Sequence, residues 1–114
     1  MKIKLLKSKI HRATVTEANL DYIGSISIDE SLMQASKLLE YEQVHVLNVT
    51  NGNRLETYAL PSDQKGEICI NGAAAHLVSP KDIVIIVSYA QMSAEEGKVF
   101  KPKIIYPNPA NEIK

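Results

Sequence analysis

The sequence predicts a mainly β protein that folds as a closed or nearly closed barrel. Many short segments alternate apolar with polar residues, a pattern typical of strands. Asn51-Gly52 and Asn71-Gly72 mark turns between such segments, and only two short stretches have helical spacing. Many short strands with two small helices are typical of barrels. The length of 114 residues fits one domain that spans residues 1–114.

The first half of the chain is expected to contain three strands and one helix. Ile3 and Leu5 alternate with lysines in the first strand, and Asp29 precedes apolar residues at helical spacing as a plausible N-cap. The expected elements are a strand over residues 2–10 that continues through 11–16, a helical turn or loop over 17–21, a strand over 22–28, a helix over 30–39 and a strand over 43–49.

The second half is expected to contain further strands and one short helix. Asn51-Gly52 predicts a two-residue type I′ hairpin turn, because that turn needs φ > 0 at both central positions. Pro102 places the last strand at a sheet edge. The expected elements are a strand over 53–60, a loop over 61–66, a strand over 67–70, a turn and short helix over 71–77 closed by Ser79-Pro80, an apolar strand over 82–89 buried on both sides, a strand over 98–106 and a mobile tail over 107–114.

Composition and charge argue against several classes of protein. Thirteen basic and thirteen acidic side chains cancel, so the chain lacks the basic surface typical of nucleic-acid binding. The basic N-terminus has too short an apolar stretch for a signal peptide, and no run approaches the about 20 apolar residues that span a bilayer. The single cysteine, Cys69, is expected to be a buried small hydrophobic residue rather than a catalytic thiol, which favours a reducing, cytoplasmic location.

Gly24-Ser25 is the unusual feature of the strand predicted over residues 22–28. Glycine within a strand usually marks a bend, a bulge or a close backbone approach. In a strained backbone, the hydroxyl of Ser25 could attack the carbonyl of Gly24 and form an ester by an N-to-O acyl shift. A simple bulge explains the same dipeptide, so the residues alone leave both interpretations open.

Two other segments could contribute to a site. Arg54 and Tyr58 share one face of a strand, where they could bracket a small carboxylate, although a solvated face with an Arg–Glu pair is the simpler explanation. The small side chains of residues 71–75 would let backbone amides approach an anion, or would let a capped helix pack tightly on the barrel.

The basic and histidine residues do not predict a metal site. Lys9, His11 and Arg12 form a basic cluster near the N-terminus. His11, His45 and His76 lack the spacing of metal ligands, so no metal is expected.

Most candidate residues stand in segments that occur in the same order in one family of proteins, and the match extends over about residues 3–106. These segments are residues 10–16 (IHRATVT), 22–25 (YIGS), 48–52 (NVTNG), Arg54, 57–59 (TYA), 71–76 (NGAAAH) and 82–86 (DIVII). The block of asparagine, glycine, three alanines and histidine is the most distinctive of them. Together these segments closely resemble the pyruvoyl-dependent aspartate 1-decarboxylases.

The resemblance implies a double-psi β-barrel with short helices, assembled as a homotetramer whose active sites lie between subunits. It also implies self-cleavage between Gly24 and Ser25 into residues 1–24 and 25–114. Ser25 would attack the Gly24 carbonyl, and the ester would break down to a dehydroalanine that hydrolyses to a covalently bound pyruvoyl group. Thr57 resembles the family threonine that stabilises the charge developing on that carbonyl. Family members mature either alone or with a helper protein.

The reaction implied by the resemblance is decarboxylation of L-aspartate to β-alanine and CO2, which supplies a precursor of pantothenate and coenzyme A. The amine of aspartate would form a Schiff base with the pyruvoyl ketone, which takes up electrons as CO2 leaves. By similarity, Tyr58 returns a proton to the resulting carbanion. The implied substrate-binding residues are Lys9, Arg54, Thr57, Gly72, Ala73 and Ala74.

Two other functions are compatible with the sequence. The chain could be a small β-barrel binding module without chemistry, in which Gly24-Ser25 is only a bulge. It could also be a pyruvoyl enzyme for another amino acid, because Arg54 would accept any small carboxylate. Neither nucleic acid nor a membrane is an expected partner.

Overall fold

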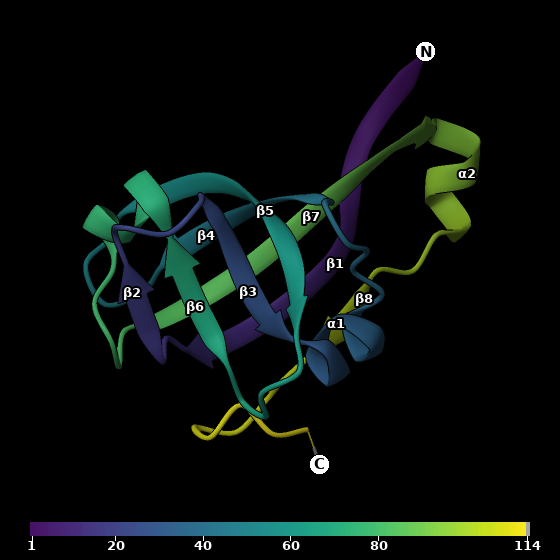
Figure 1. The fold of residues 1–114 in the computed structure, drawn as a ribbon. Helices are drawn as coiled ribbons and strands as arrows, with labels where there is room; N and C mark the ends of the chain where they lie inside the picture. The colour runs from purple at the N-terminus through teal and green to yellow at the C-terminus, as the bar shows by residue number, and fades with distance from the viewer. Residues whose placement is uncertain (114) are drawn as a thin grey trace.

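The computed structural model describes residues 1–113, and strands make up most of its regular structure (Figure 1). Along the chain the elements are β1 (Lys2–Thr14), β2 (Glu17–Asn19), β3 (Ser25–Asp29), α1 (Glu30–Ser36), β4 (Gln43–Asn48), β5 (Arg54–Ser62), β6 (Ile68–Asn71), the 3-10 helix η1 (Gly72–Leu77), β7 (Ile83–Ser93), α2 (Ala94–Val99) and β8 (Lys103–Ile105). The mainly β class predicted from the sequence is confirmed.

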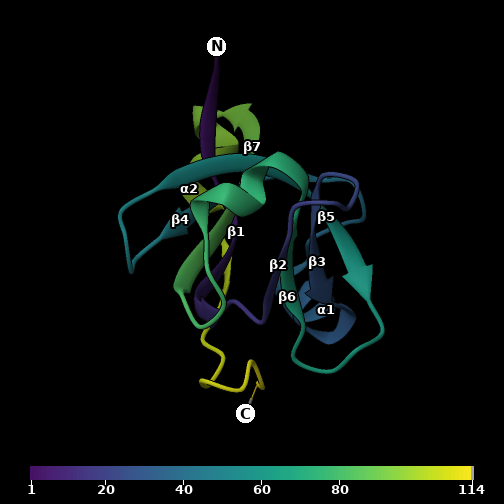
Figure 2. The same ribbon diagram turned by 60° about the vertical axis from the view of Figure 1, so that its left-hand side comes forward.

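The strands form one mixed sheet that curves into a barrel (Figures 1 and 2). Its order is β2-β6-β3-β5-β4-β7-β1-β8; the pairs β2–β6, β3–β5 and β1–β8 are parallel and the others antiparallel. Hydrogen bonds from Val15 N to Asp82 O (2.9 Å) and from Thr16 N to Ile68 O (2.8 Å) tie the link between β1 and β2 to both halves of the sheet. The fold is the double-psi β-barrel that the resemblance predicts.

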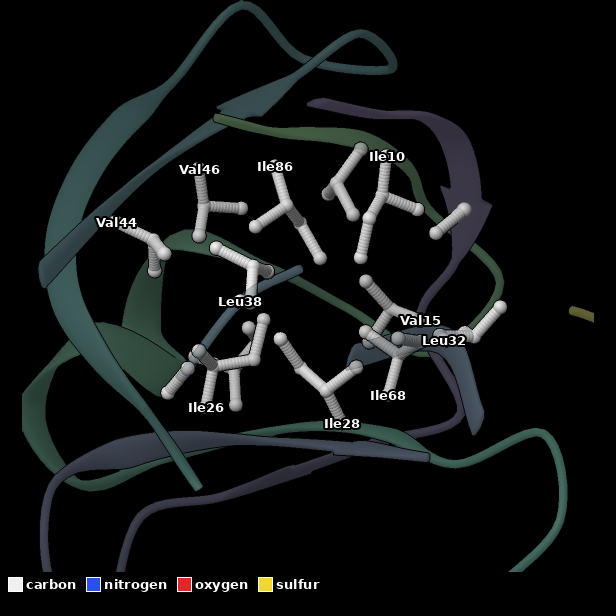
Figure 3. Packing of buried hydrophobic residues seen from close by; sticks show 14 of the residues in the cluster. Ile10, Val15, Ile26, Ile28, Leu32, Leu38, Val44, Val46, Ile68 and Ile86 are labelled. Carbon is white, nitrogen blue, oxygen red and sulfur yellow. The ribbon is translucent and has the colours of Figure 1, made fainter. Parts of the chain in front are cut away.

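Aliphatic side chains fill the interior of the barrel (Figure 3). β3 contributes Ile26 and Ile28, which are fully buried, and burying one such side chain stabilises the fold by about 1.5–3 kcal/mol. Successive side chains of a strand point to opposite faces, so Ser25 and Ser27 lie on the outer face of β3. The core therefore fixes which way the serines point.

β1 and β7 are the longest strands and pair antiparallel along their length. Their outer ends extend beyond the barrel toward the N-terminus, where α2 lies beside them (Figures 1 and 2). The register shifts between Ile10 and Ala13, where Arg12 has a φ of 67°, and a bulge of this kind bends a strand. The strand predicted over 82–89 is present as β7 (Ile83–Ser93), but it is buried on both faces only at Ile86–Ser88, and Tyr89 is exposed.

Two predictions for the first half of the chain are wrong. The segment over residues 17–21 is not a helical turn, because Glu17–Asn19 forms β2 and pairs in parallel with β6. The strand predicted over 22–28 begins only at Ser25, so Gly24 belongs to the preceding connection. A strand of three residues carries too little alternation to be recognised in the sequence. Its pairing with β6, which is distant in sequence, leaves no local signal either.

Helix α1 begins as predicted but ends earlier. The side chain of Asp29 caps it by accepting a hydrogen bond from Ser31 N at 2.8 Å. The predicted helix over 30–39 stops at Ser36, because Lys37 takes a left-handed φ of 63°.

The edge strand predicted over residues 98–106 is partly wrong. Helix α2 occupies the beginning of this segment, and only Lys103–Ile105 forms a strand, β8. Ser93 and Glu96 form a capping box at the start of α2, which is a signal visible in the sequence.

The hairpin at Asn51-Gly52 is confirmed, but its predicted turn type is wrong. β4 and β5 pair antiparallel up to Leu47 and Arg54. Gly52 has a φ of 81°, whereas Asn51 is not left-handed, and Gly52 N donates to Asn48 O at 2.8 Å. The connection is therefore a longer loop than a type I′ turn.

The C-terminal segment is fixed to the barrel over its described residues, so the predicted mobile tail over 107–114 is wrong there; residue 114 lies outside the described residues. Asn111 is buried, and its Nδ2 donates to Thr14 O and Gly66 O, both at 2.8 Å. Its Oδ1 accepts from Thr14 N at 2.7 Å. One asparagine thus joins the end of β1 to the loop before β6.

Candidate active site

Ser25, the first residue of β3, pairs directly with Asn71 at the end of β6. Both are buried, with exposed fractions of 2% and 1%. Asn71 Nδ2 donates hydrogen bonds to Ser25 Oγ (3.1 Å) and to Ser27 Oγ (3.2 Å). The hydroxyl of Ser25 is thereby held on the outer face of the sheet and shielded from water.

Asn71 is a site residue that the sequence analysis treats only as part of a turn. It occupies the N-cap of η1, yet its side chain makes no capping hydrogen bond. Asparagine at an N-cap ordinarily accepts from the backbone of the first turn, so here the side chain binds the serines instead. The available signal was the alternation of polar residues over 25–27 and 69–71, which paired strands bring onto one face.

Gly72 packs against the connection that leads into β3. Its φ is +71°, and a Cβ at this position would lie 2.7 Å from Gly24 Cα and 3.3 Å from Tyr22 O. Figure 1 shows this connection passing over the end of β6, where η1 begins. The absence of a side chain at Gly72 therefore allows its backbone to pack closely against the backbone of Gly24.

The structure around Gly24 does not itself require a glycine at this position. Its φ lies outside the left-handed region, and a Cβ built on it would meet nothing within 4 Å. The bulge explanation of Gly24-Ser25 does not apply, because the glycine lies before the strand rather than inside it.

Strand β5, the other neighbour of β3, carries Thr57 and Tyr58. The parallel register between the two strands begins at Ile26 and Ala59, so Thr57 and Tyr58 directly precede the first residue of β5 that pairs with β3. Tyr58 is half-buried, and its ring centroid lies 6.1 Å from that of Tyr41. No hydrogen bond joins Thr57 to the Gly24 carbonyl in the described chain, so its role in self-cleavage stays a prediction.

Arg54 lies at the start of β5 and is exposed on the same face as Tyr58. Four residues of extended strand separate the two by about 13 Å. The Arg–Glu pair considered from the sequence is not formed, because Glu56 contacts His45 at 3.3 Å and no ion pair of Arg54 occurs among residues 1–113. The guanidinium is therefore available to a carboxylate.

Lys9 lies on a strand that is not a neighbour of β3 in the sheet. It lies on β1, and β5, β4 and β7 separate β1 from β3 in the sheet. Burial lowers the pKa of His11, and the charges of Lys9 and Arg12 lower this pKa further, so the predicted basic cluster is present. This cluster belongs to a different part of the barrel surface from Ser25.

The predicted short helix after the turn is confirmed as η1, in the tighter 3-10 form. Ala73 is exposed and Ala74 half-buried. Side chains of this size leave the backbone open beside the Gly24–Ser25 junction, and the substrate-binding roles of Gly72, Ala73 and Ala74 stay predictions.

Cys69 is buried, as predicted, and its thiol is not poised as a nucleophile. Burial, a hydrogen bond to Glu17 and the charges of Glu17 and Glu67 together raise the pKa of Cys69 to about 12. A thiol with such a pKa stays protonated at neutral pH. It donates to Asn71 Oδ1 (3.1 Å) and to Glu17 Oε2 (3.4 Å).

The described part of the chain has several surface hollows. Five of those formed by residues 1–113 have linings that do not include Ser25 or Tyr58. In the same residues, no group of three or more His, Cys, Asp or Glu could hold a metal ion. None of the described helices is both long enough and apolar enough to cross a bilayer.

Comparison with known proteins connects this arrangement with one family. The family model described as aspartate decarboxylase matches residues 1–114. An aspartate 1-decarboxylase of Campylobacter jejuni subsp. jejuni is 62% identical over 106 residues, which cover 93% of this chain and 84% of the relative. That of Campylobacter fetus subsp. fetus is 56% identical over 113 residues (99% and 98%), and that of Acetivibrio thermocellus 55% identical over 114 residues (99% and 90%).

Proposed function

The chain belongs to the aspartate decarboxylase family, and from this we propose that it cleaves itself at Gly24-Ser25 and then converts L-aspartate to β-alanine and CO2. β-Alanine is a precursor of pantothenate and coenzyme A. The observation that carries the self-cleavage is the hydrogen bond from Asn71 to the buried hydroxyl of Ser25, at the junction where the family resemblance requires a nucleophile.

The residues around the junction fit a pyruvoyl group made from Ser25. Position 25 is buried and held by Asn71, and Tyr58 lies on the neighbouring strand β5. Close packing of Gly72 on Gly24 positions the carbonyl side of the same bond. Once formed, the pyruvoyl ketone supplies the electron acceptor that decarboxylation needs, with no metal.

Self-cleavage proceeds in three steps: an acyl shift, an elimination and a hydrolysis. Ser25 Oγ bonds to the Gly24 carbonyl carbon, the C–N bond breaks, and the nitrogen takes the hydroxyl proton, which gives an ester and an amine. Position 25 then loses its Cα proton and its Cβ–Oγ bond, which leaves Gly24 as a carboxylate and position 25 as dehydroalanine. Water hydrolyses the dehydroalanine to the ketone and releases ammonia.

Asn71 and Thr57 assist different oxygens in this sequence. Asn71 Nδ2 donates to Oγ, and Oγ gains negative charge when it leaves as part of the Gly24 carboxylate, so this hydrogen bond strengthens as the reaction proceeds. Thr57, on the strand that pairs with β3, donates to the carbonyl oxygen when that oxygen becomes negative.

The chain's own residues then bind and protonate the substrate. Arg54 binds a carboxylate of aspartate through its planar guanidinium. Tyr58 donates a proton to the carbon that has lost CO2. The backbone of Gly72, Ala73 and Ala74 lines the site, and Thr57 borders it.

We also propose that the active enzyme is a homotetramer with sites between subunits, in the cytoplasm. Lys9 lies on β1, which is not a neighbour of β3 in the sheet, and a second copy would supply its charge to the site. The single reduced thiol of Cys69 favours a reducing compartment. Cleavage measured with and without cell extract tests whether maturation uses a helper protein.

Release of CO2 from L-aspartate and from L-glutamate tests the proposed reaction. Production of β-alanine from aspartate, with little reaction of glutamate, is the expected result. Equal turnover of glutamate would instead support a pyruvoyl enzyme of another specificity, and no turnover by cleaved protein would support a binding module.

A further inference from the structure

We propose that Cys69 is a positioning residue for self-cleavage, because its thiol fixes the side-chain amide of Asn71 with Nδ2 rather than Oδ1 facing Ser25. The inference rests on the proposed cleavage at Ser25 and adds a residue to it. Cys69 itself touches no reacting atom and acts only through Asn71.

The residues involved form a polar row on the outer face of two paired strands. Cys69 and Asn71 are two residues apart on β6, so they share a face, and they pair with Ser27 and Ser25 of β3. Cys69 Sγ lies 3.1 Å from Asn71 Oδ1. Cys69, Asn71 and Ser25 have exposed fractions of 5%, 1% and 2%, so water competes little for these hydrogen bonds.

The donors and acceptors around the side chain of Asn71 decide which of its two amide orientations is favoured. The two N–H bonds of Asn71 each have one acceptor, Ser25 Oγ and Ser27 Oγ, while Oδ1 accepts from the thiol of Cys69. If the side-chain amide of Asn71 were rotated by about 180°, its N–H groups would face Cys69 Sγ, which is a weak acceptor. It would also direct Oδ1 at Ser25, where no donor would then stabilise the departing Oγ.

The thiol can serve as a donor because it keeps its proton. Burial raises the pKa of Cys69 to about 12, far above neutral pH. Glu17 Oε2 is a second acceptor for the same proton, but its distance of 3.4 Å is longer than the 3.1 Å to Asn71 Oδ1. The bond to Asn71 is therefore the one that we expect to affect cleavage.

The first test measures the rate of cleavage of newly synthesised chain by denaturing mass spectrometry, with and without cell extract. Cys69→Ala and Cys69→Val both lack the donor, and Val fills more of the space left by sulfur. Loss of one hydrogen bond predicts cleavage about tenfold slower in both. Cys69→Ser keeps a donor and should restore a rate near that of the unsubstituted chain, and Glu17→Gln should leave the rate unchanged.

The second test observes the Asn71 amide in chain that cannot cleave. In a Ser25→Ala chain, the side-chain N–H signals of Asn71 should form one sharp pair by nuclear magnetic resonance. Adding Cys69→Ala should shift and double or broaden this pair, as the amide samples both orientations, and adding Cys69→Ser should restore it. Melting temperatures confirm that each variant is folded.

Several results would overturn the role of Cys69 alone. These are equal cleavage rates with Cys69 and with Ala or Val, no restoration by Ser, slowing by Glu17→Gln as large as by Cys69→Ala, or an unchanged Asn71 signal in Cys69→Ala. If the unsubstituted chain never cleaves, with or without extract, the proposed function itself is wrong and this role is lost with it.

Discussion

Gly72 packs backbone to backbone against Gly24, so closely that a Cβ at Gly72 would come within 2.7 Å of Gly24 Cα. The residue before it, Asn71, holds the hydroxyl of Ser25. The last residue of β6 and the first residue of η1 therefore position both sides of the bond that we propose is cleaved.

Gly72→Ala should impair both folding and cleavage. A left-handed φ costs a residue with a side chain about 1–2 kcal/mol, and forcing an extra carbon into a filled space costs about 1–3 kcal/mol. Urea unfolding of the uncleaved Ser25→Ala chain, with and without Gly72→Ala, measures the loss. Gly24→Ala is the matched control: it has free space and no left-handed φ, so its free energy of unfolding should change little. Equal losses for the two substitutions would contradict the packing described above.

Tyr58→Phe should leave cleavage intact and reduce turnover. The substitution removes only the hydroxyl proposed as proton donor, and such a group typically contributes about 10²–10⁴-fold to the rate. Cleavage is followed by mass spectrometry and kcat by β-alanine production. Tyr41→Phe, on the neighbouring ring 6.1 Å away, is the control and should keep its kcat. Failure of Tyr58→Phe to cleave would assign Tyr58 to self-processing instead.

Arg54→Ala should mainly raise KM for aspartate. A hydrogen bond to a charged group contributes about 1.5–3 kcal/mol, which predicts a rise of about 10- to 150-fold. Glu56→Gln, two residues along the same exposed face, is the control, because Glu56 contacts His45 rather than the proposed carboxylate. Unchanged kinetics in Arg54→Ala would remove Arg54 from the site.

Asp29 should stabilise the fold at neutral pH and lose this effect in acid. Burial acts to raise the pKa of Asp29, but hydrogen bonds from Gly66 N and from Ser31 outweigh it and lower this pKa. Because the folded value lies below the unfolded value of about 3.9, the stabilisation is complete above the unfolded value and disappears as pH falls through the folded one.

Asp29→Asn keeps the shape of this cap and removes its charge. An amide has one acceptor oxygen, so Gly66 N loses its charged acceptor; in the uncleaved Ser25→Ala chain the free energy of unfolding should fall by about 1.5–3 kcal/mol at pH 7, and by less near the bottom of the acid range. Urea titrations at several pH values measure the difference. Asp63→Asn, on an exposed loop, is the control. A loss that is the same at every pH would show that charge is not the cause.

Much of the barrel could be predicted because each long strand alternates in its own sequence. Ile26 and Ile28 face the core in β3 as the pattern requires. The short strand β2 could not be found this way, since its pairing with β6 depends on the whole fold. Asn111 shows the same limit: nothing local indicates that its amide binds the backbone of Thr14.

The candidate site was predicted in part for similar reasons. Gly24 and Ser25 were recognised as an unusual dipeptide, but the role of Asn71 depends on the pairing of two strands that are distant in sequence. Lys9 illustrates a further limit, because its position in the sequence does not show that three strands separate β1 from β3 in the sheet.

The most direct test of self-cleavage is the mass of mature protein under denaturing conditions. We expect two species, residues 1–24 ending in a carboxylate and residues 25–114 lighter by one ammonia than a chain that begins with serine. Ser25→Ala should give one intact species and no β-alanine, whereas Ser27→Ala, which removes the other acceptor of Asn71, should still cleave. An intact chain with an ordinary amide bond at Gly24-Ser25 that still makes β-alanine would contradict the account.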